Sequence, residues 1–290
     1  MKKRSYSHIF FLAPHMIIFI VFFVIPMIYG IFVSFTRWDI FSPPVWTGLD
    51  NYRTILFDTE STFFRQFRNG FSNTALLVTL IVPFQILVPL LIALLLHVKP
   101  PFSRIFQGVF YVPVLFSISS VAITWIFMLD PGFGLINRTT GVVINWFGVP
   151  ELWAGIVAMT IWWIIGINMV IYVAALHSID TSVKESAMLD GAGFWTKVLR
   201  IYIPLIKFPL LFTFLAATTT QFNIFGQPAM LALDVGSERG YVIIMYIRNL
   251  AFGMARPLAG IASTMSVLLG IFIGVFAVLQ MYVLIRQENH

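Results

Sequence analysis

Residues 177–205 read HSIDTSVKESAMLDGAGFWTKVLRIYIPL. This stretch is polar and carries the acids Asp180, Glu185 and Asp190, whereas the chain on either side of it forms apolar runs of membrane length. A polar segment between two apolar runs predicts a structured loop that faces something other than lipid. The rest of the chain is organised around this loop and the spans that it joins.

The composition predicts a membrane protein that crosses the bilayer several times. The chain has 290 residues, is 59% hydrophobic and 10% charged, and has a mean hydropathy of +0.91, whereas soluble proteins contain about 25% charged residues. The absence of cysteine excludes disulfides and thiol chemistry. Lys2, Lys3 and Arg4 precede an apolar run to about Phe35 without a convincing small-residue cleavage site, which favours an uncleaved first span over a signal peptide.

Six stretches are long and apolar enough to cross a bilayer, which takes about 20 residues in a helix. We therefore predict an all-α membrane protein, with residues 1–290 forming a single transmembrane domain. The third and fifth stretches are the least regular, because Pro113 interrupts one and polar residues lie near the end of the other. The predicted spans are about 9–35, 71–97, 105–129, 152–176, 206–233 and 257–285, with the loop 177–205 between the fourth and the fifth.

Basic residues predict the orientation of the spans. If the N-terminus is cytoplasmic, every lysine lies in the short inner segments, which then carry Lys and Arg at a higher density than the outer loops. The positive-inside rule therefore predicts that both termini and the loop 177–205 are cytoplasmic. The topology explains the net charge of +6, and no soluble basic domain is present to bind nucleic acid. The outer loops 36–70, 130–151 and 234–256 either receive an external protein or simply connect helices.

The first half of the polar loop predicts a short helix followed by a sharp turn. Thr181 or Ser182 can cap the helix, and Glu185 lies in its first turn, where a negative charge suits the positive end of the helix dipole. Gly191 and Gly193 allow the chain to reverse.

The second half predicts another helix over 194–203, with apolar residues on one side and Lys197 and Arg200 on the other. Pro204 then ends this helix or begins the next span. Two interpretations of the helix pair stay open. It forms a compact knob on the cytoplasmic surface, or it is amphipathic and lies on lipid headgroups.

Three groups of residues follow one another closely in this loop: Glu185-Ser186-Ala187, Asp190-Gly191-Ala192-Gly193 and Ile203-Pro204-Leu205. The pattern resembles the EAA loop of ABC importer permeases, whose usual form is E-A-A, a glycine shortly after, and a hydrophobic-Leu-Pro ending. This chain departs from that form at Ser186, where alanine is usual, and at Ile203 before the proline. Both changes are small.

Other stretches resemble the carbohydrate-uptake branch of that family, whose best-known members import maltose and oligosaccharides with a binding protein. They are TGLDNYRTIL at 47–56, the run 110–137 that ends in DPGFGLIN, and 174–193. The resemblance implies a multi-pass protein of the prokaryotic plasma (inner) membrane. It implies four kinds of partner: a second related permease, two ATP-binding subunits, an extracytoplasmic solute-binding protein and a sugar substrate. This chain contains no G-x-x-x-x-G-K-[ST] phosphate loop, so ATP and Mg²⁺ belong to partner subunits.

The resemblance also implies roles for loop residues. The EAA loop docks into a groove of the ATPase subunit, where Glu185 pairs with a basic residue, while Ala187 and Gly191 permit close approach and the turn. The residues that the resemblance assigns to coupling are Glu185, Ser186, Ala187, Asp190, Gly191, Gly193 and Pro204.

Polar side chains within spans are costly and therefore often functional. Two clusters flank the loop, and we predict that they line a substrate path: Trp163, Gly166 and Asn168 in the fourth span, and Thr218, Gln221, Asn223 and Gln227 in the fifth. Aromatic rings with amides suit a sugar. The alternative is that threonines and amides join helices and that tryptophan marks a membrane interface. Asn73, Gln85 and the run 117–120 are weaker candidates.

The function predicted from these features is the permease subunit of an ATP-driven importer of a sugar or oligosaccharide. A glycerol phosphate or another polyol derivative is the alternative substrate, although it requires cationic groups that the spans of this chain do not offer. A membrane-embedded enzyme requires carboxylates, histidines or a nucleophile clustered at membrane depth, and no such cluster is visible. An ion-coupled carrier more often shows internal repeats with broken helices, and no clear repeat is present.

Overall fold

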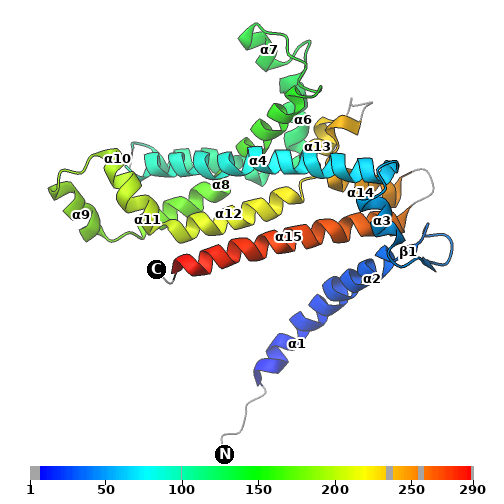
Figure 1. Ribbon diagram of the computed structural model, residues 1–290. Coiled ribbons are helices and arrows are strands. Elements are labelled where there is room, and N and C mark those ends of the chain that lie inside the picture. The colour runs from blue at the N-terminus through cyan, green and yellow to red at the C-terminus, as the bar shows by residue number, and fades with distance from the viewer. Residues whose placement is uncertain (1–6, 99, 233–237, 254–257, 289–290) are drawn as a thin grey trace, which may run out of the picture. The chain divides into compact units, whose positions relative to one another are not determined.

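The computed structural model describes residues 7–98, 100–232, 238–253 and 258–288, which are mostly helical (Figure 1). The chain divides into two compact units. The first comprises Met1–Arg68 and Ile244–Phe272, and the second comprises Asn69–Ile243 and Ile273–His290. The single transmembrane domain stays a prediction.

Four helices in the described residues are long and apolar enough to cross a membrane, and two bent helix pairs bring the number to six if each pair is one span. The four long helices match the predicted first, second, fourth and sixth spans. They are Phe11–Ser34, Thr62–His97, Glu151–His177 and Ala259–Val283.

The first unit begins with the helix of the first span. It consists of α1 (Ser7–Phe19), a π-helical turn (Ile20–Val24) and α2 (Ile25–Ser34). Within α2 only Val33 and Ser34 are buried, and the apolar side chains before them are mostly exposed. A helix that exposes apolar side chains nearly all round suits contact with lipid.

A cluster of hydrogen bonds from polar side chains to backbone carbonyls, the polar knot, holds the end of α2 in the first unit. The amide of Asn51, in α3 (Asp50–Leu56), donates to the carbonyls of Ser34 (2.9 Å) and Thr36 (2.8 Å). The hydroxyl of Thr264 lies 2.9 Å from the same Ser34 carbonyl. These side chains satisfy carbonyls that the end of a helix leaves without an internal partner. Thr36–Arg37 (β1) pairs antiparallel with Val45–Trp46 (β2) beside the knot.

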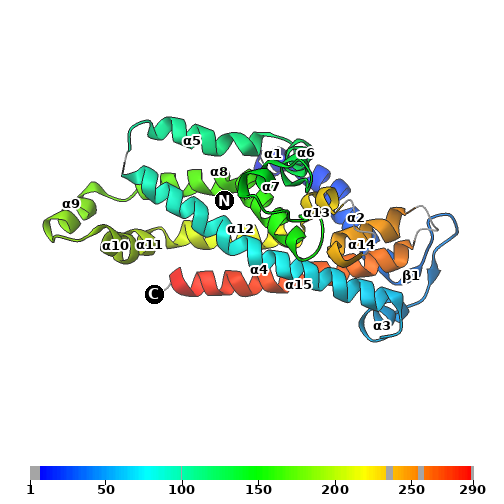
Figure 2. The same cartoon turned by 90° about the horizontal axis from the view of Figure 1, so that it is seen from above.

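The second unit is built on α4 (Thr62–His97), α8 (Glu151–His177) and α12 (Lys207–Phe222), together with the end of α15 (Ala259–Glu288). Its apolar core joins α4, α8 and the chain leading into α12. Figures 1 and 2 both show α9 (Thr181–Leu189) extending beyond the ends of α8 and α12. The second unit also contains α7 (Leu135–Thr140), α13 (Gly226–Leu231) and a 3₁₀ turn (Glu238–Gly240). All of α14 (Ile243–Phe252) except its first residue belongs to the first unit.

The predicted third span, 105–129, is not one straight helix. A helical segment made of α5 (Ser103–Tyr111) and a 3₁₀ turn (Val112–Leu115) meets α6 (Ile118–Leu129) at 101°. Pro113 cannot donate to the helical ladder, and Phe116 and Ser117 are extended. The hydroxyl of Ser117 then accepts from the Ser120 N–H and begins a new helix (3.3 Å).

The predicted fifth span, 206–233, is not one continuous helix. The segment Phe194–Leu205 consists of α10 (Phe194–Lys197), a π-helical turn and α11 (Ile203–Leu205), and it meets α12 at 70°. The break lies at Ile206, two residues after Pro204. At its other end, α12 stops at Phe222, and the short helix α13 follows after a three-residue link.

Candidate transport cavity and coupling loop

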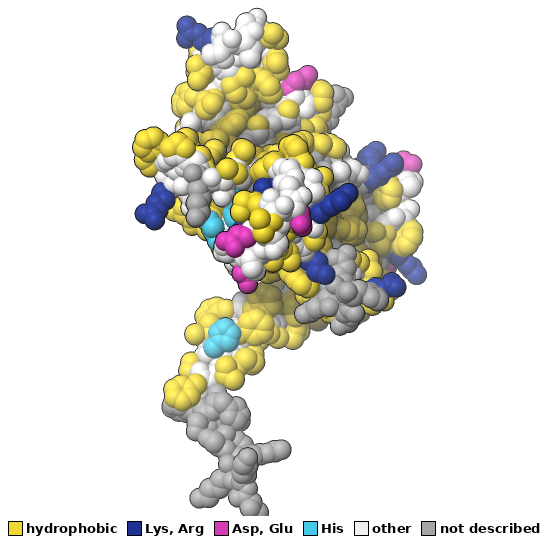
Figure 3. All heavy atoms as spheres, turned by 90° about the vertical axis from the view of Figure 1, so that its left-hand side faces the viewer, with side chains coloured by type: hydrophobic (Ala, Val, Ile, Leu, Met, Phe, Trp, Pro, Cys, Tyr) yellow, Lys and Arg dark blue, Asp and Glu magenta, His cyan; other side chains and the backbone are white. Residues whose placement is uncertain are grey.

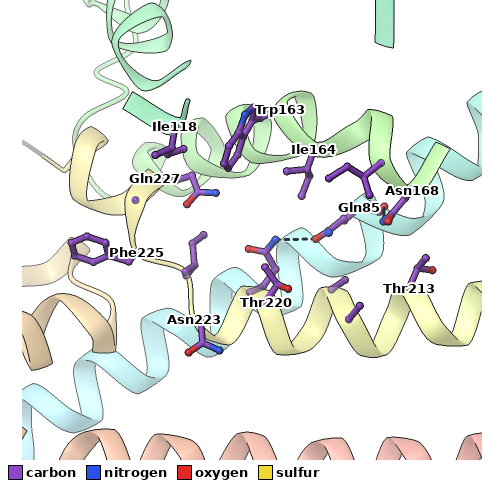
Figure 4. Close-up of a pocket in the computed structure, with 16 residues that line it drawn as sticks. Gln85, Ile118, Trp163, Ile164, Asn168, Thr213, Thr220, Asn223, Phe225 and Gln227 are labelled. Carbon is purple, nitrogen blue, oxygen red and sulfur yellow. Dashed lines mark hydrogen bonds between the residues drawn. The ribbon is translucent and has the colours of Figure 1, made fainter. Parts of the chain in front are cut away.

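A cavity of about 410 Å³ lies in the second unit. Its walls come from α4, α6, α8, α12 and α13, and Figure 4 shows side chains from all of them converging on it. None of the residues that line it is charged. The lining residues with polar side-chain atoms are Gln85, Trp163, Asn168, Thr213, Thr220, Gln221, Asn223 and Gln227.

The cavity brings together most of the residues predicted to line a substrate path. Trp163, Asn168, Gln221, Asn223 and Gln227 all contribute to its wall, although they come from three separate elements. Their role in transport stays a prediction, because a cavity by itself does not identify what passes through it. Gly166 and Thr218 lie elsewhere.

Gly166 and Thr218 serve helix packing. A Cβ on Gly166 would lie 2.6 Å from the Cα of Tyr111 and 2.7 Å from the carbonyl oxygen of Phe110, so glycine allows α5 to approach α8 closely. The hydroxyl of Thr218 donates to the Phe214 carbonyl (2.8 Å) and accepts from Gln280 of α15 (3.3 Å). Neither residue is among those that line the cavity.

Gln85 is the polar centre of the cavity wall, and the sequence indicated it only weakly. Its side-chain oxygen accepts from the amide of Gln221 at 2.9 Å, as the dashed line in Figure 4 marks. Its main-chain carbonyl accepts from the amide of Asn168, also at 2.9 Å. One residue of α4 is therefore tied to α8 through its backbone and to α12 through its side chain.

Proline explains why Asn168 binds a backbone carbonyl. Pro89 lies four residues after Gln85 and has no N–H, so the Gln85 carbonyl lacks its usual helical donor. In a membrane such a carbonyl needs a donor from a neighbouring helix, and Asn168 supplies it. The interpretation of polar side chains as links between helices is thus confirmed for Asn168.

Trp163 also bonds to a break in a helix. Its indole N–H donates to the carbonyl of Phe116 (3.1 Å), an extended residue at the bend between the 3₁₀ turn and α6. The indole also forms part of the cavity wall. Its neighbour Trp162 instead packs edge-on against Trp125, with ring centroids 6.1 Å apart.

The sequence missed one lining threonine and misplaced one weaker candidate. Thr220 belongs to the polar cluster that the sequence shows in the fifth span, and it lines the cavity. Thr213 gave no signal, yet its hydroxyl lies 2.6 Å from the buried hydroxyl of Tyr172. Asn73 lies away from the cavity and donates to the Tyr241 carbonyl (2.8 Å). A polar residue four positions before a proline in an apolar run, as at Gln85, is the signal that could have been used.

The polar loop contains the predicted helix–turn–helix, with one correction. Asp180, and neither Thr181 nor Ser182, caps α9, because its carboxylate accepts from the Ser182 N–H (3.1 Å). Gly191 has φ +68°, which confirms the sharp reversal. Gly193 is extended and precedes α10.

The two short helices form a concave surface, and the hollow that it bounds has a volume of about 690 Å³. Five of the residues assigned to coupling line it: Ser186, Ala187, Asp190, Gly191 and Gly193. Glu185 and Pro204 are exposed outside it. Exposed apolar side chains surround this concave surface, and the most exposed of them is Leu189, at 90%. Figure 3 looks onto this end of the second unit and shows acidic and basic side chains lying among hydrophobic ones.

The base of the loop belongs to the core of the second unit. Val198, Tyr202 and Ile206 are buried in one cluster with residues of α4 and α8. The ammonium group of Lys184, in α9, donates to the Leu176 carbonyl at the end of α8 (3.2 Å). A displacement of the loop would therefore also displace the helices that line the cavity, because packed interiors transmit strain.

Comparison with known proteins gives one family. Residues 59–287 match the family described as binding-protein-dependent transport system inner membrane component. A protein named as a probable starch degradation products transport system permease, AmyD of Thermoanaerobacterium thermosulfurigenes, is 29% identical over 290 residues, covering 99% of this chain and 96% of that protein. The lactose transport system permease protein LacF of Rhizobium radiobacter is 30% identical over 230 residues, covering 74% of this chain and 75% of that protein.

The fold is shared with a solved transporter. A chain of a bacterial ABC transporter involved in the import of the acidic polysaccharide alginate superposes with a TM-score of 0.84 at 25% identity. The match covers 98% of this chain and 96% of that one.

Proposed function

Because this chain belongs to the family of binding-protein-dependent transport system inner membrane components, we propose that it is the permease subunit of an ATP-driven importer that carries a sugar or oligosaccharide into the cell. The chain is a multi-pass inner membrane protein. The proposal concerns its cargo, its partners and the way in which ATP hydrolysis reaches it.

The uncharged cavity is the observation that carries the sugar assignment. Trp163 offers an aromatic surface, and Gln85, Asn168, Gln221 and Gln227 offer amides that both donate and accept hydrogen bonds. Such a lining suits a ligand that is rich in hydroxyl groups and has an apolar ring face. Relatives named for lactose and for arabinooligosaccharides point the same way.

Glycerol phosphate is the second candidate. The sn-glycerol-3-phosphate permease UgpA of Pectobacterium atrosepticum is 25% identical over 210 residues, covering 71% of this chain and 69% of that protein. A phosphate group requires cationic or strongly donating partners, and the residues that line this cavity include no Lys or Arg. A phosphorylated cargo would depend on cations from another subunit.

The importer we propose has further subunits. This chain forms a heterodimer with a second related permease, and two ATP-binding subunits bind ATP and Mg²⁺. An extracytoplasmic solute-binding protein delivers the sugar, in line with the related alginate transporter, whose structure includes a substrate-bound periplasmic protein. Six spans, with each bent pair counted as one, leave both termini and the loop 177–205 in the cytoplasm.

The loop couples transport to ATP hydrolysis in this proposal. An ATPase subunit contacts the exposed side chains of Glu185 and Leu189 and the concave surface between α9 and α10. The buried base of the loop then passes rigid-body movement to α8 and α12. Coupling requires a two-state element that both sites bias, and we assign this role to the junction at Ile206, where the helices meet at 70°.

The test is transport by the assembled complex in proteoliposomes. Uptake of lactose and an arabino-oligosaccharide would be compared with uptake of sn-glycerol 3-phosphate and an alginate oligosaccharide, each with its binding protein. We expect ATP-dependent uptake of a neutral sugar. Uptake of the anionic compounds alone would contradict the sugar assignment.

A further inference from the structure

We infer that the hydrogen bond between Gln85 and Gln221 is the ligand sensor of the cavity, and that hydroxyl groups of an uncharged saccharide take its place during transport. The inference rests on the proposed function and adds to it the residues that detect the cargo. The bond joins α4 to α12 across the cavity (Figure 4) at 2.9 Å, between side chains that are 9% and 3% exposed.

The two bonds made by Gln85 differ in how easily they can be exchanged. Pro89 has no N–H, so the Gln85 carbonyl has no donor within α4. Breaking its bond to Asn168 would therefore leave a buried acceptor without a partner. The side-chain bond to Gln221 belongs to the lining of the cavity, where an entering ligand can replace one amide with a hydroxyl. Asn168 therefore fixes the position of Gln85, while Gln221 is its exchangeable partner.

The chemistry of the exchange selects the ligand. Once the pair separates, the Gln85 oxygen needs a donor and the Gln221 amide needs an acceptor. A hydroxyl group supplies both, whereas a carboxylate only accepts and an ammonium group only donates. A carboxylate or an ammonium group at this position would leave one of the two buried amide groups without a partner, which a polar site discriminates against strongly.

The position of the bond on α12 connects it to the polar loop. Thr213 lies between Gln221 and the break at Ile206, and its hydroxyl is 2.6 Å from that of Tyr172 on α8. That contact holds α12 at one point along its length. Release of Gln221 from Gln85 removes one of the ties that hold the far end of α12, whose other ties are the bond between Thr218 and Gln280 and the packing of Phe222 against α4. The near end of α12 is packed against the base of the loop.

A double-mutant cycle tests the sensor in the assembled transporter. ATP hydrolysis without binding protein or sugar would be measured for Gln85→Leu, Gln221→Leu and the double variant. Each single variant should raise hydrolysis roughly two- to tenfold, the change in population expected from the loss of one hydrogen bond. The double variant should match the single ones, because both changes remove the same bond.

Thr79→Val is the matched control. Thr79 is exposed on the same helix, and among the residues that the structure describes its hydroxyl bonds only to the Ala75 carbonyl one turn earlier, so ligand-independent hydrolysis should not change. Single variants at Gln85 and Gln221 that behave like this control, or a double variant whose effect is the product of the two single effects, would overturn the inference.

The absence of cysteine from the chain allows a second test. Gln85→Cys and Gln221→Cys would be combined and linked with a cleavable bifunctional thiol reagent. Linking should abolish stimulation of ATP hydrolysis by lactose- or arabino-oligosaccharide-loaded binding protein, and cleavage should restore it. Undiminished stimulation of the linked complex would contradict the sensor alone, whereas a wild-type complex that transports neither sugar would contradict the proposed function.

Discussion

The side-chain amide of Asn168 donates a 2.9 Å hydrogen bond to the main-chain carbonyl of Gln85, four residues before Pro89. The carbonyl comes from α4 and the amide from α8, separated by 83 residues in sequence. A proline in a membrane helix is tolerated here because a second helix replaces the donor that it removes.

Substitution of Asn168 should therefore be repaired by substitution of Pro89. Asn168→Leu is expected to lower the stability of the folded chain by about 0.6–2 kcal/mol, the range for hydrogen bonds between membrane helices. Adding Pro89→Ala restores an N–H that can bond to Gln85 within α4, so the double variant should recover much of the loss. Thermal unfolding in detergent measures both effects. A double variant less stable than Asn168→Leu would show that the proline has another role.

Gly166 should tolerate no side chain. Gly166→Ala places a methyl group 2.6 Å from the Cα of Tyr111, and the backbone of α5 must move away. We expect a loss of about 1–3 kcal/mol, as for other overpacked sites. Gly108→Ala on α5 is the control, because nothing lies within 4 Å of a Cβ there. Equal unfolding temperatures for the two variants would contradict the close approach of α5 and α8.

Gly191 should accept asparagine better than valine. Its φ of +68° is a conformation that asparagine adopts at modest cost and a β-branched residue adopts rarely. Because open space surrounds the position, the difference between Gly191→Asn and Gly191→Val isolates backbone strain from crowding. Substrate-stimulated ATP hydrolysis should survive in the first variant and be strongly reduced in the second. Similar hydrolysis in both would mean that the turn does not need this conformation.

Glu185 tests the docking role without disturbing the fold. Its side chain is exposed on α9, so Glu185→Lys should leave expression and thermal stability unchanged. If Glu185 pairs with a basic residue of the ATPase, charge reversal should abolish substrate-stimulated hydrolysis, and Glu185→Gln should retain part of it. The assay compares hydrolysis by the complex with and without sugar-loaded binding protein. Wild-type stimulation in Glu185→Lys would refute the docking role.

The helix–turn–helix at 181–205 shows how far local signals reach. The reversal could be predicted from Gly191 because it depends on the backbone conformation of that residue alone. The cap was assigned one or two residues too late, since Asp180, Thr181 and Ser182 are all good caps and only the geometry chooses among them. Pro204 was predicted to end the second helix or to begin the next span, and the break lies two residues later, at Ile206.

The predicted path residues show where such signals stop. Trp163, Asn168 and Gln221 were chosen because polar and aromatic groups stand out in apolar spans, and all three line one cavity. Gly166 was grouped with them because it lies between Trp163 and Asn168 in the sequence, but its neighbours are Phe110 and Tyr111 of another helix. Residues within one span give no information about which side of that span faces a cavity and which faces a packed helix.

The sequence by itself determined that this protein is helical, that it lies in a membrane, and that a polar helix–turn–helix interrupts its spans. These properties depend on hydropathy, on proline and glycine, and on residues within a few positions of one another. Only the tertiary structure decided that Gln85 joins Asn168 to Gln221, and that Pro89 makes the first of these bonds necessary. Hydrogen bonds between helices depend on rotation and depth, and folding fixes both by packing residues that are far apart in the chain.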